Sequence, residues 1–417
     1  MLFTPEPLRR QRQDIARQFQ AGKLAEGEAG ARLIEADADF SGGYIMLGNQ
    51  RSRAGDLAEA ESCYWKAVDR MPCDYAGYLA LSDVLLKQNR DPLSNRLMLL
   101  GIWKLALSQE VPKEVAGIFR QRMKFGPEFD FNDPRAYEAL ATLLEHRDAP
   151  AAEVRDRLLP YELLNDLQRQ SPGGVQPDLL RDILAAGERS IPLWRAALRE
   201  WAQVRTTVAQ DAAAMIAALL GELGGPEMLD ELLELANRDE EPICLHADWA
   251  IWRIGQRFPA ETLAKFRAGS ATARPAWRCA LAEQMIRLPE TPGIEAAVVE
   301  LLAGFAGFAH QRVAADLLVI VIRALNELRR PDEAKRVFHE FHGLLPKAER
   351  QWVRNALDRK LAPSGFAEAV AGFSIGEICS ERILMEDRDE EKKEKKEEDE
   401  EEAVAGRRRR LRFLGSA

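Results

Sequence analysis

Apolar residues recur through this sequence at the spacing of α-helices. Leu245, Trp249 and Trp252, for example, fall on one helical face. Runs of Val, Ile and Thr, which favour strands, are scarce, whereas Ala, Leu, Glu and Arg recur everywhere. The pattern predicts an all-α protein.

A six-residue segment returns along the chain after 33 residues. Residues 21–26 read Ala-Gly-Lys-Leu-Ala-Glu, and residues 54–59 read Ala-Gly-Asp-Leu-Ala-Glu. A period of this length is typical of helical hairpins that stack on one another. We therefore expect an α-solenoid, in which each hairpin packs against the next.

The stretch 41–72 carries the signature of such a hairpin at eight positions. These positions are Tyr44, Leu47, Gly48, Gly55, Ala60, Tyr64, Ala67 and Pro72. The stretch resembles a tetratricopeptide repeat (TPR), with weaker copies at 13–39 and 75–107. The resemblance implies a TPR-like domain over 1–124, in which Gly48 and Ala60 mark a close helix contact and Tyr64 fills the space between hairpins.

Four polar residues are candidates for binding a protein or peptide on this domain. Asn49 and Arg53 lie one turn apart, and Asp83 and Lys87 are the further candidates. The carboxylate clamp of some TPR proteins is not expected, because Ile45 stands where the clamp has Lys. The alternative is that these residues belong to an ordinary solvated helix face.

Two prolines and a glycine interrupt the helical pattern at 125–135, which we expect to be a linker. A second helical-repeat domain is expected over 136–363. Proline at the start of helical segments predicts helices that begin at Pro160, Pro177 and Ile191.

Within the second domain, an ending of the form apolar-x-x-apolar-Gly occurs twice. One copy ends at Gly224, and Gly255 ends the other copy 31 residues later. The stretch 161–267 resembles HEAT-type repeats, close to the bacterial HEAT-like family that includes phycobilisome lyases. That resemblance implies a fold and not a reaction.

No familiar catalytic motif occurs in the sequence, so we expect neither catalytic residues nor a cofactor. Two pairs of possible metal ligands, His339 with His342 and Cys244 with His246, lack the further ligands that zinc needs nearby. We expect no metal site.

A cluster of aromatic and charged residues offers an enzymatic alternative. It consists of Asp248, Trp249, Trp252 and Arg253. Some HEAT-like proteins excise DNA bases with a Trp and an Asp, and others act on bilins as lyases. The competing interpretation is that the tryptophans form a core stripe.

The charge pattern singles out residues 364–417 as a flexible tail. Twelve acids and five bases occupy 386–402, followed by an arginine cluster from Arg407 to Arg412. The formal net charge of the whole chain is -9, and the residues before Glu386 are themselves net negative, which makes nucleic acid an unlikely partner for the body. The arginine cluster could bind RNA, an anionic lipid or an acidic protein, or fold back on the acidic run.

Five widely spaced cysteines without a C-x-x-C motif suit a reducing compartment. No apolar segment predicts a signal sequence or a membrane span. We expect a cytoplasmic, non-enzymatic adaptor or scaffold that binds protein partners through solenoid surfaces.

Overall fold

The structure is a computed structural model of the 417-residue chain. It describes residues 5–108, 112–123, 152–170, 174–204, 206–236, 243–270, 281–282, 284–285, 287–289, 291–300, 311–327, 329–358 and 373–380. These residues form helices and no strand, apart from one isolated β-bridge between Gly174 and Ser380. The prediction of an all-α protein is confirmed for this part of the chain.

The contacts between residues divide the chain into two compact units. Unit 1 comprises residues 1–171 and 177–216, and unit 2 comprises residues 172–176 and 217–417. The division falls inside one helix, α12 (Thr207–Leu223). We had expected the division at 125–135, residues that lie outside the described part of the chain.

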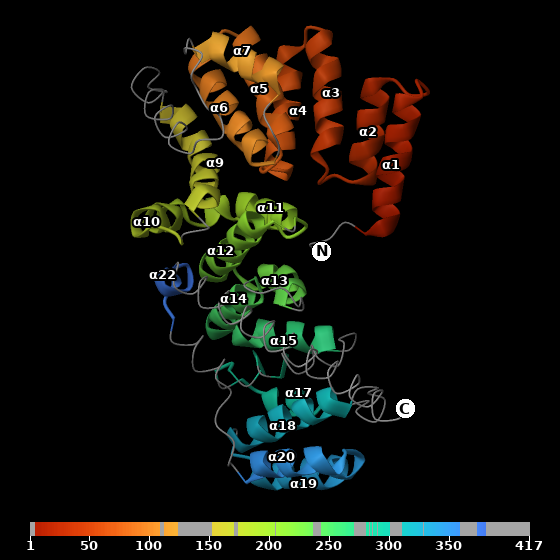
Figure 1. Cartoon of the computed structure of the whole chain (residues 1–417), viewed down its shortest axis with the longest axis vertical. Helices are drawn as coiled ribbons and strands as arrows, with labels where there is room; N and C mark the ends of the chain where they lie inside the picture. The colour runs from red at the N-terminus through yellow and green to blue at the C-terminus, as the bar shows by residue number, and fades with distance from the viewer. Residues whose placement is uncertain are drawn as a thin grey trace, which may run out of the picture. The chain divides into compact units, whose positions relative to one another are not determined.

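Unit 1 is a succession of helices, and from α1 to α7 each helix contacts the next along the chain (Figure 1). They are α1 (Glu6–Gln20), α2 (Glu26–Ala36), α3 (Ser41–Arg53), α4 (Leu57–Arg70), α5 (Tyr75–Lys87), α6 (Asp91–Ser108), α7 (Lys113–Met123), α9 (Ala152–Gln170), α10 (Pro177–Ala186) and α11 (Ile191–Trp201). The predicted starts at Pro177 and Ile191 are confirmed.

The predicted start at Pro160 is wrong, because α9 begins eight residues earlier, at Ala152, and includes Pro160. Proline removes one backbone hydrogen bond of a helix. Leu158 before it and Leu164 after it are both fully buried, so packing on both sides of the proline stabilises one continuous helix.

The recurring six-residue segment places the same turn at two points of unit 1. Gly22 and Gly55 adopt positive φ angles of 68° and 83°, a backbone conformation that glycine reaches without strain. In the second turn, the Asp56 carboxylate accepts a hydrogen bond from the Glu59 N–H at 3.2 Å and caps α4. The sequence thus ends one helix and starts the next by local chemistry alone.

Close approach of α3 and α4 explains the small residue at position 48. A Cβ atom on Gly48 would lie 2.6 Å from the Tyr64 ring, so only glycine fits without a shift of the ring. Tyr64 and Ala60 are 4% and 0% exposed. Tyr64 therefore packs on a helix of its own hairpin.

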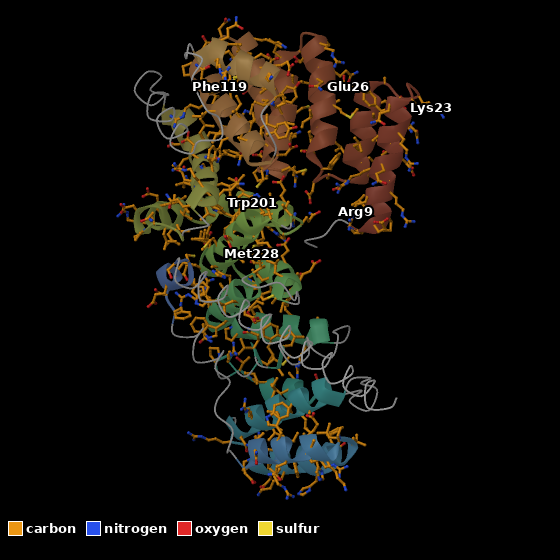
Figure 2. All side chains as sticks on the ribbon, viewed as in Figure 1. Arg9, Lys23, Glu26, Phe119, Trp201 and Met228 are labelled. Carbon is orange, nitrogen blue, oxygen red and sulfur yellow. The ribbon has the colours of Figure 1, made fainter. Side chains whose placement is uncertain are left out.

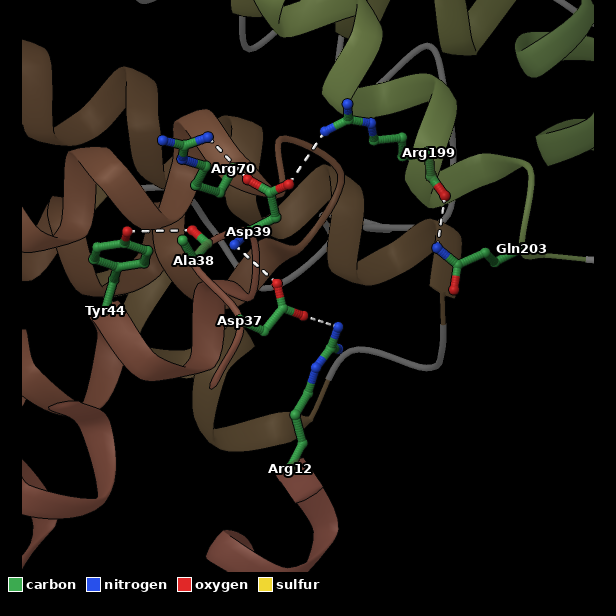
Figure 3. A network of polar contacts seen from close by, with 8 residues as sticks. All are labelled: Arg12, Asp37, Ala38, Asp39, Tyr44, Arg70, Arg199 and Gln203. Carbon is green, nitrogen blue, oxygen red and sulfur yellow. Dashed lines mark hydrogen bonds and ion pairs between the residues drawn. The ribbon is translucent and has the colours of Figure 1, made fainter. Parts of the chain in front are cut away.

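A network of charged and polar groups joins α11 to the connection between α2 and α3 (Figure 3). Asp39 forms ion pairs with Arg70 of α4 at 2.8 Å and with Arg199 of α11 at 3.2 Å. Asp37 pairs with Arg12 of α1 and accepts the Asp39 N–H at 3.0 Å. Helix α11 thus belongs to unit 1.

Large aromatic side chains lie in the interior of unit 1. Phe119 and Trp201 are 1% and 3% exposed, whereas Lys23 and Arg9 are exposed (Figure 2). Removal of such apolar side chains from water stabilises the fold.

Unit 2 continues with the C-terminal part of α12 and eight further helices among the described residues. They are α13 (Leu229–Ala236), α14 (Ile243–Arg257), α15 (Pro259–Ser270), α17 (Ile294–Glu300), α18 (Gln311–Glu327), α19 (Pro331–Phe341), α20 (Lys347–Leu357) and α22 (Ile375–Ile378). Helices α12 and α14 touch closely, because a Cβ on Gly221 would lie 2.5 Å from the Ala250 Cβ.

The tail that we expected from residue 364 contains a folded segment. Residues 373–380 include α22, and Ile378 and Cys379 are 0% exposed. This part of the tail prediction is wrong, because Ile378 and Cys379 are buried and the Phe373 and Ile378 carbonyls contact Trp249 and His246 of α14. The arginine cluster from Arg407 to Arg412 lies outside the described residues.

A search of the described residues finds no helix that is both long and apolar enough to span a membrane.

Candidate functional site

Six polar residues on α2, α3 and α5 form two sets, each joined by hydrogen bonds and ion pairs, and we call the two sets together the polar row. One set is Glu26 with Asn49 and Arg53, and the other is Lys87 with Ser52 and Asp83. The row contains all four residues that the sequence predicted as protein-binding candidates.

Asn49 is held in one orientation by two neighbours. Its Oδ1 accepts a hydrogen bond from the Tyr64 hydroxyl at 2.7 Å, and its Nδ2 donates to Glu26 Oε1 at 3.1 Å. Burial and the nearby acids Asp83 and Glu26 raise the pKa of Tyr64 to about 12, so the phenol keeps its proton and remains a donor. The amide therefore presents a defined N–H edge.

Glu26 also forms an ion pair with Arg53 through its second carboxylate oxygen. The side chain of Glu26 is only 16% exposed, whereas that of Arg53 is 72% exposed. Glu26 thus fixes both predicted residues of α3, while most of the guanidinium stays accessible to a ligand.

Asp83 and Lys87 pair with each other on α5 at 2.8 Å, with side chains that are 60% and 49% exposed. Lys87 Nζ also donates to Ser52 Oγ of α3 at 3.3 Å. This contact joins the α5 pair to Ser52 of α3. Two acids and two bases balance the charge of the row.

Sequence reasoning missed Glu26 and Ser52. Glu26 is part of the recurring six-residue segment, but its partners lie 23 and 27 residues further along the chain. The repeat predicts that adjacent hairpins touch. It does not give the register that brings Glu26 to Asn49.

The residues of the enzymatic alternative, Asp248, Trp249, Trp252 and Arg253, are close in sequence, but they do not share partners. On α14, Arg253 forms a two-pronged ion pair with Glu222 of α12 at 2.7 and 3.0 Å, and this pairing raises the pKa of the guanidinium. The Asp248 carboxylate accepts a hydrogen bond from Gln284 at 2.9 Å.

The two tryptophans of this cluster differ in burial. Trp249 is 1% exposed and donates its indole N–H to the Phe373 carbonyl at 3.1 Å. Trp252 is half-buried, with its ring centroid 6.4 Å from that of Trp249. Asp248, Trp249 and Arg253 therefore each contact a different part of unit 2, and the three do not converge on one point.

The possible metal ligands also have packing partners. His246 is fully buried against the Ile378 carbonyl at 2.9 Å, and His342 stacks on Phe338 with 4.4 Å between ring centroids. Among the described residues, no group of three or more His, Cys, Asp or Glu side chains is arranged to hold a metal ion.

Two comparisons with known proteins were negative. No protein-family model matches the chain, and no curated protein sequence matches it significantly. The TPR-like and HEAT-like resemblances are therefore carried by the residues of this chain alone.

Proposed function

We propose that the chain is an α-solenoid adaptor or scaffold, TPR-like in its N-terminal part and HEAT-like further on, that binds a protein partner through the polar row. It acts by binding and not by catalysis. The proposed compartment is the cytoplasm, on the basis of the cysteine usage of the sequence.

The observation that carries the proposal is a recurring separation of 31 to 35 residues between residues that join neighbouring helical hairpins. In unit 1, Ser41 Oγ contacts Asp74 at a separation of 33 residues, and Lys87 contacts Ser52 at 35. In unit 2, Arg253 contacts Glu222 at 31, and Lys265 contacts Asp230 at 35. Recurring separations of this size are what stacked hairpin repeats produce.

The polar row has the chemistry of a peptide-binding surface. A fixed asparagine amide can pair with a peptide backbone, and Arg53 and Lys87 can pair with acidic side chains. The Lys87–Asp83 ion pair is exposed on both sides, and exposed pairs contribute only about 0–1 kcal/mol, so a ligand can replace it at little cost. In the Arg53–Glu26 pair the Arg53 side chain is exposed, whereas Glu26 is mostly buried.

Reversal of two charges in the row tests the proposal. In the double variant Arg53→Glu, Lys87→Glu, we expect the proteins that co-purify with the tagged full chain to be lost while the helical circular dichroism stays unchanged. The matched control is Arg181→Glu on α10, whose side chain is 70% exposed outside the row. Retention of every partner by the double variant would refute the row as the binding surface.

A further inference from the structure

Residues 373–380, which we call the strap, are bound to unit 2 mainly through backbone carbonyls. The Phe373 carbonyl accepts the Trp249 indole N–H at 3.1 Å, and the Ile378 carbonyl contacts His246 Nε2 at 2.9 Å. The Cys379 carbonyl accepts the Val175 backbone N–H at 2.9 Å, within the β-bridge of this segment. Because a carbonyl oxygen can only accept, His246 carries its proton on Nε2 in this contact.

The donors that hold the strap are themselves buried. His246 and Trp249 are 0% and 1% exposed and lie three residues apart on α14, so both contact the strap from one face of the helix. A buried donor that loses its acceptor destabilises the folded state, because the donor is left without a hydrogen bond and away from water. This face of α14 is therefore built to receive peptide carbonyls.

The strap brings its own local structure to this face. Ser374 and Glu377 form a capping box: Ser374 Oγ accepts the Glu377 N–H at 3.3 Å, and the Glu377 carboxylate accepts the Ser374 N–H at 2.8 Å. The capped turn directs Ile378 and Cys379 into the core of unit 2, while Gly376 and Glu377 remain exposed. Only two of eight side chains are fully buried.

We propose that His246, Trp249 and Val175 form a peptide-binding site that the chain fills with its own strap, and that the strap exchanges with a peptide of the same chemistry added in trans. That chemistry is a Ser-x-x-Glu capped turn followed by two apolar side chains, here Ile378 and Cys379. Exchange is feasible because two buried side chains must offset the conformational entropy of eight ordered residues. The site lies in unit 2 and does not depend on the polar row.

Alkylation of Cys379 in the wild-type full chain reports strap release. Burial raises the pKa of this thiol to about 12, and only a thiolate reacts with iodoacetamide, so the bound strap protects it. A synthetic peptide with the sequence of residues 373–380, with Ser in place of Cys, should capture the released state and accelerate alkylation of Cys379 several-fold. The buried Cys63 of unit 1 should show no acceleration. Unchanged Cys379 alkylation at saturating peptide would overturn the proposal.

Direct binding gives a second, independent measurement. A fluorescent form of the peptide should bind the full-length Ile378→Asp variant about tenfold or more tightly than the wild type, since the variant's own strap no longer competes. The control Leu344→Asp changes a 56% exposed residue of unit 2 and should bind as the wild type does. A control peptide that carries Asp at the position of Ile378 should bind neither the wild type nor either variant. Equal binding of the peptide to all three proteins would show that the strap is only a structural part of unit 2.

Discussion

The polar row and the strap-binding residues His246 and Trp249 of α14 differ in the sequence distance to the residues that they contact. In the row, every contact joins residues at most 35 positions apart, within one hairpin or between neighbouring hairpins. On α14, His246 and Trp249 bind carbonyls that lie 132 and 124 positions away. The row joins helices that are near one another in sequence, whereas the contacts of His246 and Trp249 require a return of the chain that no local pattern encodes.

Two glycine contacts, one in each unit, differ in what the glycine meets. In unit 1 a Cβ on Gly48 would meet the Tyr64 ring, a side chain that can rotate without movement of its helix. In unit 2 a Cβ on Gly221 would meet the backbone and Cβ of Ala250, which cannot move without the helix. A contact with a side chain and a contact with a backbone respond differently to substitution.

Loss of the Tyr64 ring should have the largest effect. Tyr64→Ala removes a 4% exposed aromatic side chain and leaves a cavity, so we expect unit 1 to lose about 3–5 kcal/mol of unfolding free energy in a denaturant titration. Tyr64→Phe, which removes only the hydrogen bond to Asn49, should cost about 1 kcal/mol. Equal losses of unfolding free energy for the two substitutions would mean that the Tyr64 ring does not contribute to packing in the hairpin.

Substitution of each of these two glycines by alanine tests how rigid the two helix contacts are. Gly221→Ala should destabilise unit 2 by about 1–3 kcal/mol, because α12 and α14 must separate to admit the new atom. Gly48→Ala should cost less than about 1 kcal/mol, because the ring can shift and alanine favours the helix. Thermal unfolding of both variants ranks the two losses of stability, and a larger loss for Gly48→Ala would show that Gly48, and not Gly221, lies at the more rigid contact.

The stability of unit 1 should depend on pH through Glu200 of α11. Its carboxyl group accepts the Cys73 backbone N–H at 2.6 Å, and burial raises its pKa from 4.5 to about 8. A raised pKa means that the folded state binds the proton more tightly than the unfolded state does. The contribution is therefore fully present below about pH 4.5 and is lost as the pH rises through about 8.

The measurement is denaturant unfolding at several pH values. We expect the wild type to lose more than about 1 kcal/mol between pH 5 and pH 8, and Glu200→Gln, which keeps an acceptor and cannot ionise, to lose less. A Glu200→Gln variant with the same pH dependence as the wild type would assign the effect to other groups.

The smallest effect on stability is expected in the polar row. Arg53→Ala removes the side chain that is 72% exposed from its ion pair with Glu26, and the change in unfolding free energy should stay below about 1 kcal/mol. A larger loss in thermal or denaturant unfolding would identify Arg53 as a structural residue and weaken its role in binding.

The hairpin of unit 1 could be predicted because its determinants are local. Gly55 ends α3, Asp56 caps α4, and Tyr64 lies against Gly48, all within one repeat. The start of α9 could not be predicted in this way. Burial of Leu158 overrides the helix-breaking preference of Pro160, and burial is a tertiary property.

The candidate sites show the same limit. Asn49 and Arg53 were found because residues one turn apart share a helix face. Asp248, Trp249 and Arg253 were grouped by closeness in sequence, yet neighbours on a helix point in different directions, and their partners lie on three other segments. The strap was missed because its short apolar stretch lies in a region whose composition predicts a tail.

The central proposal, that the polar row holds a protein partner, is tested most directly by site-specific photocrosslinking in the cells that make the protein. A photoreactive amino acid is placed at Ser52 of the row, at Asp83 of the row, or at the exposed control position Arg181. The proposal predicts that Ser52 and Asp83 crosslink to the same discrete partner and that Arg181 does not. The same crosslinks from all three positions, or crosslinks from Arg181 alone, would contradict it.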